Sequence, residues 1–231
     1  MANDFKPALV VVDFQEDFCP PNGSLAVKDG RTIAKVINNL LSLPFVLKVA
    51  TKDYHPSDHI SFAPNHPPPH NIPFTSKITI KNPYNPTETQ STLLWPVHCV
   101  QGTPGSDLIP ELDISKIDHV IGKGQDKRVE MYSAFADPFR SPPVSRSNLE
   151  SLLRKAGVTH VFCVGLAMDY CVKFTAIDSA GAGFRTFVVE EGAKAVNPDA
   201  WGSVVEELKK AGVETVSVDG EEVENVKKLS V

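Results

Sequence analysis

A cysteine stands where an apolar run gives way to a helical pattern. Residues 159–164 are mostly apolar, and apolar side chains recur at helical spacing after Cys171. Cys171 therefore falls between a buried strand and the start of a helix. Backbone N–H groups and the positive end of a helix dipole can stabilise a thiolate there, and a thiolate can act as a nucleophile. The ordinary alternative is a cysteine buried as a small apolar side chain.

A carboxylate and an ammonium group follow two other apolar runs. Asp13 comes after residues 8–12, and Lys123 stands between two glycines after residues 119–121. Ligands of open α/β sheets bind at the carboxyl ends of the strands, so both side chains are candidates for one site. Taken alone, Asp13 could be a turn residue, with Asp17 as a competing carboxylate, and Lys123 could be an ordinary loop lysine.

A further group of residues could bind a metal ion. Asp53 and His55 follow the run at residues 45–51, and positions i and i+2 of extended backbone point the same way. His98 is the best third ligand. One carboxylate and two imidazoles leave coordination positions open, which is typical of catalytic rather than structural metal sites. The other histidines of the same segment are further candidates: His59, His66 and His70.

These residues depend on strands and helices that alternate along the chain. The apolar runs are continuous, as in parallel sheets that are buried on both faces. Helical patterns lie between them, with a capping box at 147–150 and an Asn-Pro start at 197–198. We therefore predict an α/β fold with three layers, in which a doubly wound, mostly parallel six-stranded sheet separates two helix layers. The predicted strands cover residues 8–12, 45–51, 119–121, 159–164, 185–189 and 214–218.

One long segment interrupts this alternation. Residues 56–104 are rich in proline and show little periodicity beyond 77–80. Long irregular segments inside compact domains are usually functional. We interpret this one as an insertion that covers the active site at the carboxyl edge of the sheet. Since no flexible linker is evident, we expect residues 1–231 to form one domain.

The composition narrows the choice of partners. The chain has 231 residues, 42% of them hydrophobic, and a formal net charge of -5, which argues against nucleic acid or an anionic membrane as the main partner. The first residues lack the pattern of a signal peptide, and no apolar stretch approaches the ~20 residues that cross a bilayer. We expect a cytoplasmic protein with reduced cysteines, a nuclear or peroxisomal pool being an alternative.

Together these residues resemble the isochorismatase-like hydrolases and, within them, the nicotinamidases. The matching segments occur in the order of that family and extend over nearly the whole chain. Tyr54 stands where many relatives have tryptophan, and the segment at 63–86 is longer than in short bacterial relatives; both features resemble fungal-type members. The matching segments are residues 12–18, 53–59, 94–99, 123–124 with 132–135, and 165–172.

The resemblance implies a catalytic triad of Asp13, Lys123 and Cys171. In such a triad the thiol attacks a carboxamide carbon, the carboxylate carries the proton, and the lysine keeps the carboxylate ionised. Ammonia then leaves a thioester, which water hydrolyses. The resemblance also implies an oxyanion hole formed by the backbone N–H groups of Ala167 and Cys171, and a cis peptide bond between Leu166 and Ala167.

The resemblance also implies a metal and a substrate pocket. It assigns Asp53, His55 and His98 to one divalent ion, with zinc as the first choice and manganese or iron as alternatives. His59 is the second choice for a ligand. The ion would orient a pyridine ring through its nitrogen. Three residues match the aromatic wall around that ring: Phe18, Trp95 and Tyr132.

The expected activity is hydrolysis of nicotinamide, or of the similar pyrazinamide, in NAD salvage. The alternative is a related amidohydrolase that acts on a carbamoyl or ureido substrate, but such relatives generally lack the metal ligands. A non-catalytic, redox-responsive binding protein is a third reading, against which the intact triad argues. A homo-oligomer is one option for the assembly.

Overall fold

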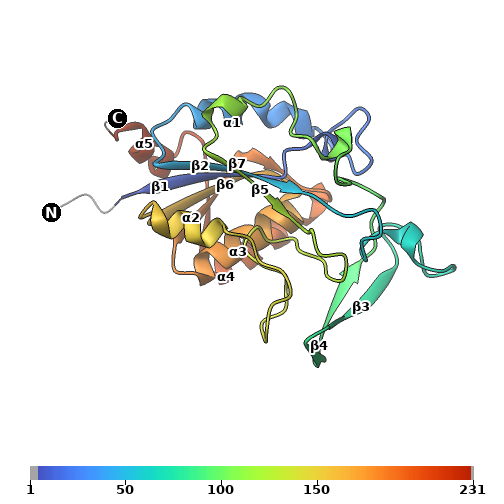
Figure 1. Cartoon of the computed structure of the whole chain (residues 1–231). Helices are drawn as coiled ribbons and strands as arrows, with labels where there is room; N and C mark the ends of the chain where they lie inside the picture. Colours follow the sequence, from blue (N-terminus) through green and yellow to red (C-terminus); the bar gives the residue numbers. More distant parts are fainter. Residues whose placement is uncertain (1–4, 230–231) are drawn as a thin grey trace.

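A six-stranded sheet forms the centre of the computed structural model, which describes residues 5–229. The strand order is β5-β2-β1-β6-β7-β8, and every neighbouring pair is parallel (Figure 1). The predicted doubly wound sheet is confirmed. Its strands are β1 (Pro7–Val12), β2 (Leu47–Asp53), β5 (His119–Lys123), β6 (His160–Leu166), β7 (Arg185–Lys194) and β8 (Val213–Val216).

Helices cover both faces of this sheet. Figure 1 shows α1 (Ala34–Leu41) and α5 (Glu221–Lys227) on one face, with the other three helices opposite them. Alternate residues of β1 enter the two cores, so that Leu9 packs in the core under α1 and Val10 in the core on the opposite face. The other three helices are α2 (Leu149–Lys155), α3 (Lys173–Gly181) and α4 (Trp201–Lys210).

The helix ends agree with most of the predicted signals. The Asn197 side chain accepts a hydrogen bond from the Asp199 N–H, and a short 3-10 turn leads from there into α4. The capping box at residues 147–150 is only half formed. Ser147 Oγ accepts the Leu149 N–H, but Glu150 pairs with Arg154 at 2.7 Å instead of reaching back. None of the helices described between residues 5 and 229 is long and apolar enough to cross a membrane.

The proline-rich insertion contains a hairpin that the sequence did not reveal. Its strands β3 (Lys77–Asn82) and β4 (Asn85–Leu93) pair antiparallel and form a separate two-stranded sheet. Figure 1 shows this hairpin beyond the carboxyl ends of β2 and β5. The chain then returns through Trp95 and His98, which are buried at the edge of the main sheet. The insertion therefore supplies residues to that edge.

The link from β6 to α3 is a tight one. Gly165 has a φ of 125°, and a π-helical turn at Met168–Val172 follows before α3 begins. Any side chain at position 165 would collide with β1, because a Cβ there would lie 2.0 Å from the carbonyl oxygen of Val12. Glycine is the residue that tolerates both this φ and this contact.

Gly165→Ala should destabilise the protein strongly, by roughly 3 kcal/mol or more, because strain and a backbone clash coincide there. The free energy of unfolding in urea measures the effect. Gly181→Ala at the end of α3 is the matched control, since its added Cβ would have no described atom within 4 Å apart from its chain neighbours and the adjacent backbone of its own helix. That variant should be neutral or slightly more stable. Equal stability of the two variants would contradict the proposed strain and backbone clash at position 165.

Candidate active site

The carboxyl edge of the sheet brings Asp13, Lys123 and Cys171 together. Asp13 follows β1, Lys123 ends β5, and Cys171 lies in the π-helical turn after β6. Lys123 Nζ is 2.9 Å from Asp13 Oδ2 and 3.5 Å from Cys171 Sγ. All three side chains are buried. The structure thus brings the three residues together: Lys123 contacts the other two, and a carboxylate oxygen of Asp13 lies within 4.8 Å of Cys171 Sγ.

Lys123 also contacts a second carboxylate. Its Nζ lies 2.5 Å from Asp53 Oδ1 and donates a hydrogen bond to the Met131 carbonyl at 3.2 Å. Burial alone would lower the pKa of Lys123, but Asp13 and Asp53 raise it well above its usual range. The buried ammonium therefore stays charged, and the two carboxylates offset the cost of removing it from water.

The two oxygens of the Asp13 carboxylate differ: Oδ1 accepts a hydrogen bond, and Oδ2 is left to accept a proton. Thr51 Oγ1 donates to Asp13 Oδ1 at 2.6 Å and accepts the Asp13 N–H at 3.1 Å. Asp13 Oδ2 is buried and, within residues 5–229, has only its ion pair with Lys123 and no hydrogen-bond donor of good geometry. Burial raises the pKa of Asp13, Lys123 lowers it, and the net effect is a raised value. A raised pKa makes Asp13 a better proton acceptor.

Cys171 differs from the expected helix-stabilised thiolate. Burial raises its pKa well above the usual value, and Asp13 raises it further, while Lys123 only partly lowers it. This direction favours the neutral thiol over a preformed thiolate. The reason is that Cys171 is enclosed beside two carboxylates and that α3 begins only at Lys173. Attack by sulfur must therefore accompany transfer of its proton to a base.

The chain turns at Ala167 without the expected cis bond. The Leu166–Ala167 peptide is trans, and the cis bonds of residues 5–229 all precede proline. Ala167 adopts φ 57° and ψ 59°, a left-handed conformation that reverses the chain at the end of β6. Ala167 and Cys171 line the same cavity, as the predicted oxyanion hole requires. The expectation of a cis peptide is therefore wrong, while the oxyanion hole of Ala167 and Cys171 stays a prediction.

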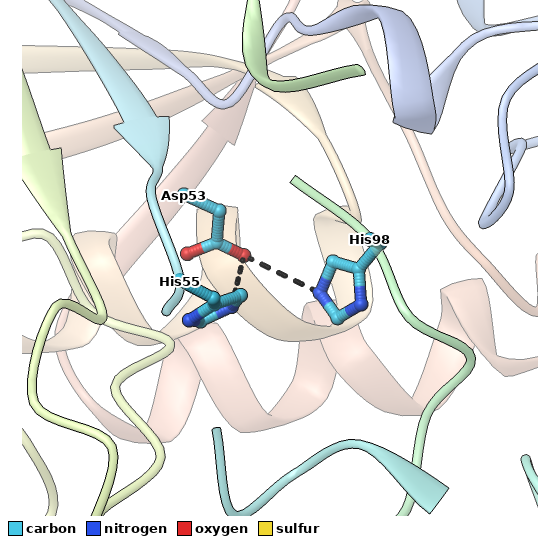
Figure 2. A group of neighbouring side chains, drawn as sticks. All are labelled: Asp53, His55 and His98. Atoms are coloured by element: carbon cyan, nitrogen blue, oxygen red, sulfur yellow. Dashed lines mark ion pairs between the residues drawn. The ribbon is translucent and has the colours of Figure 1, made fainter. Parts of the chain in front are cut away.

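Asp53, His55 and His98 form a group of donors beside this triad. Asp53 Oδ2 lies 3.5 Å from His55 Nε2 and 3.8 Å from His98 Nε2, and Figure 2 shows both rings directed at that oxygen. Each Nδ1 donates to a backbone carbonyl at 2.8 Å, Gly124 for His55 and Pro96 for His98. Both Nε2 lone pairs therefore face the carboxylate, which is how histidine ligands are held for a metal.

The charge and hydrogen bonding of this group fit a divalent cation. His55 Nε2 is buried and has no hydrogen-bond partner in the described part of the chain. Burial would raise the pKa of Asp53, but Lys123 and His55 hold it well below its usual range, so its carboxylate is ionised. One ligand atom from each of the three residues lies within 4.8 Å of the other two. Two imidazoles and a carboxylate suit zinc or a related ion.

His59 lies next to this group but is not part of it. Its ring is 4.0 Å from that of His55. Nδ1 bonds Ser61 Oγ at 2.8 Å, and Nε2 donates to the Val129 carbonyl at 3.0 Å. Burial and the neighbouring His55 lower the pKa of His59 to about 2, so its ring is neutral. With both nitrogens engaged, His59 serves as packing for His55 rather than as a ligand.

A cavity of about 20 Å³ is lined by Cys171 of the triad and by Asp53 and His98 of the metal group. Phe18, Trp95 and Tyr132 line it as predicted, and Tyr170 is an additional aromatic wall, 4.9 Å from Trp95 in an edge-to-face arrangement. Trp95 Nε1 donates to the Tyr132 hydroxyl at 3.0 Å, which fixes both rings. Glu130 lines the cavity as well. Sequence reasoning missed both residues, although Tyr170 lies within the matched segment 165–172 and Glu130 two residues before the segment 132–135.

Gln15 is a second supporting residue that sequence reasoning missed. Its side-chain amide bonds both backbone groups of Asp53, at 2.8 Å each, and the Ser106 carbonyl at 2.9 Å. It therefore holds the end of β2 in place from the loop after β1. Asp17, the carboxylate that competed with Asp13, instead accepts the Cys99 N–H at 2.7 Å. Its role is structural.

Three non-glycine residues at this edge have left-handed backbone conformations. They are Asp13 (φ 49°), Cys99 (φ 46°) and Ala167 (φ 57°). Each carries part of the site or adjoins it. Such conformations are uncommon for residues with a Cβ, and they concentrate where function constrains the backbone.

Known proteins are similar to this chain in sequence and fold over most of their length. A nicotinamidase of Acinetobacter baylyi is 38% identical over 91% of this chain and 92% of its own. The yeast nicotinamidase Pnc1p, bound to the inhibitor nicotinaldehyde, superposes with a TM-score of 0.85 at 35% identity, covering 91% of this chain and 99% of that one. A pyrazinamidase of Pyrococcus horikoshii in complex with zinc superposes with a TM-score of 0.69 at 30% identity, covering 92% of this chain and 99% of that one.

The match to a family covers the same residues as the sheet and the site. Residues 7–220 match the isochorismatase domain, a span that includes Asp13, Lys123, Cys171 and the metal group. The chain belongs to the isochorismatase domain family.

Proposed function

We propose that this protein is a nicotinamidase, which hydrolyses nicotinamide to nicotinate and ammonia. The observation that carries the proposal is one small cavity lined by Cys171, whose thiol contacts the Lys123–Asp13 pair, and by Asp53 and His98 of the Asp-His-His group. The relatives that share the fold at 35–38% identity are nicotinamidases. A carbamoyl or ureido substrate has no ring nitrogen for the Asp-His-His group to orient.

The first half of the reaction forms a thioester. Cys171 Sγ attacks the carboxamide carbon as its proton passes to Asp13 Oδ2, the oxygen without a hydrogen-bond donor. Backbone N–H groups of Ala167 and Cys171 are proposed to hold the oxyanion. The C–N bond then breaks, the proton moves from Asp13 to the nitrogen, and ammonia leaves. Lys123 stays charged throughout and balances the negative charge that develops.

The second half restores the enzyme. Water attacks the thioester carbon and gives a proton to Asp13, and the C–S bond breaks. Asp13 returns the proton to sulfur, and nicotinate is released. One carboxylate thus serves as base and acid in turn. Its raised pKa suits both roles, because it lies closer to neutral pH than that of an ordinary aspartate.

Substrate orientation falls to the other residues of the cavity. Asp53, His55 and His98 would hold a divalent ion, which we propose to be zinc, with manganese or iron as alternatives; when bound, it supplies a Lewis acid for the pyridine nitrogen. Phe18, Trp95 and Tyr132 flank the ring on its faces and edges.

The proposed enzyme comprises one domain over residues 1–231, with residues 56–104 covering the site. A homo-oligomer and a cytoplasmic location stay predictions. Pyrazinamide is expected as a second substrate, because its ring and amide resemble those of nicotinamide.

Cys171→Ala should abolish the release of ammonia from nicotinamide, since the cavity holds no second nucleophile of this kind. A coupled ammonia assay on metal-loaded protein measures this. Cys163→Ala, which alters a buried cysteine of β6, should retain turnover. Substantial activity in Cys171→Ala would rule out the thioester route, and an inactive wild-type protein would rule out the proposed function.

Thr51→Val should lower kcat/KM by about tenfold or more, because a hydrogen bond to a charged group is lost from Asp13. Thr51→Ser keeps the hydroxyl and should recover most of the activity. If Thr51 merely filled space, valine would be tolerated better than serine. The relative kcat/KM of Thr51→Val and Thr51→Ser therefore decides whether the Thr51 hydroxyl or only its volume matters.

His98→Ala should reduce the metal content of the purified protein well below one ion per chain, as measured by elemental analysis, and raise KM. His70→Ala, an exposed histidine of the same insertion, should leave both unchanged. Full metal content in His98→Ala would show that the third ligand is another residue.

A further inference from the structure

A second cavity, of about 170 Å³, lies next to the catalytic one. Its walls come from the hairpin, from the segment at 130–140 and from α3. Glu130 and Tyr132 line both cavities, so the two cavities adjoin at these side chains. The larger cavity has room for several water molecules, whereas the catalytic one holds about one.

The proposed reaction requires small molecules to enter and leave the site before the acyl group is released. Ammonia must leave, and a water molecule must enter, while the acyl group is still bonded to Cys171. The ring of that acyl group is proposed to lie against Phe18, Trp95 and Tyr132, which leaves no free space in a catalytic cavity of about 20 Å³. A second opening would let the small molecules exchange without release of the acyl group.

The inner end of the larger cavity is polar. Glu130 is only 4% exposed, and its Oε1 accepts the Met131 N–H at 2.9 Å. Ser133 and Thr92 are also buried there, and the Thr92 hydroxyl bonds that of Tyr132 at 3.1 Å. Carboxylate and hydroxyl oxygens can accept hydrogen bonds from ammonia, from ammonium and from water.

The lining also includes an ion pair and apolar side chains. Asp178 pairs with Arg140 at 2.9 Å, and the Arg140 side chain is 57% exposed to solvent. Phe139, Ile80 and Phe174 are apolar members of the lining, and Phe174 stacks on Tyr132 with centroids 5.6 Å apart. A lining that mixes polar and apolar side chains suits the transit of small polar molecules rather than their retention.

We propose that this cavity is a side passage through which water reaches the thioester on Cys171 and ammonia leaves. The proposal rests on the nicotinamidase function. In each turnover the C–N bond breaks first and ammonia departs past Glu130; water enters by the same way and supplies the oxygen of the new C–O bond as the C–S bond breaks. Nicotinate leaves through the catalytic cavity afterwards.

Filling the passage tests this proposal. Gln90 lines it from β4, opposite Ile80, whereas its neighbour Thr89 points to the other face of the hairpin and is outside the lining. Gln90→Trp places a ring in the passage, and Gln90→Phe is a smaller second variant should the first fold poorly. Thr89→Trp is the matched control, since it adds the same ring to the same strand.

Rapid mixing of metal-loaded protein with nicotinamide, followed by acid quenching and intact-mass analysis, gives the fraction of nicotinoyl thioester. We expect Gln90→Trp and Gln90→Phe to acylate at the wild-type rate but to accumulate thioester, with kcat lowered by roughly fivefold. Thr89→Trp should behave as wild type.

Two results would overturn the passage. One is an unchanged kcat and thioester fraction in both folded Gln90 variants. The other is slower acylation without thioester accumulation, because the ring would then disturb the substrate wall through Tyr132. Failure of the nicotinamidase function itself is distinguishable, because the wild-type protein would then release no ammonia from nicotinamide.

Discussion

The buried ammonium group of Lys123 is the interaction on which the site depends. It contacts Asp13 at 2.9 Å and Asp53 at 2.5 Å, so it joins the residue proposed as the base to the residue proposed as a metal ligand. Neither carboxylate could remain ionised at this depth without a positive partner. Loss of this charge would leave two buried carboxylates facing each other, and one of them would have to take up a proton.

The sheet makes this contact available. β5 and β1 are separated by β2, so the long side chain of Lys123 must pass the end of β2 to reach Asp13. Asp53 is the last residue of that middle strand and meets the ammonium on its way. Gln15 and Thr51 then hold the backbone of Asp53 and the carboxylate of Asp13 from neighbouring elements. The residues proposed for catalysis and those proposed for metal binding are consequently joined by one network of hydrogen bonds and ion pairs.

Much of this could be predicted because parallel strands place their carboxyl ends at one edge. Continuous apolar runs located the six strands, and Asp13, Lys123 and Cys171 each followed such a run. The resemblance to a family assigned the metal ligands, and the structure places those residues together. The hairpin escaped prediction because the residues of β4 are mostly polar and half exposed, so they carry no apolar pattern.

Other features depend on surroundings that a linear sequence does not display. The neutral state of Cys171 results from burial beside two carboxylates that come from different strands. The exclusion of His59 from the donor group follows from its bonds to Ser61 and to Val129, which lies 70 residues away. The cis bond implied by the family is absent here, since a left-handed Ala167 makes the turn. Burial, charges on neighbouring strands and contacts that form only in the fold decide these features.

The left-handed conformations of Asp13, Cys99 and Ala167 bear on how this protein can evolve. Each costs about 1–3 kcal/mol, and the rest of the fold must supply that stability. Selection for thermal stability alone would favour glycine or asparagine at these positions, whereas selection for turnover would retain the present residues. The active edge is thus where stability and activity are in conflict, and laboratory evolution toward heat resistance should lose activity there first.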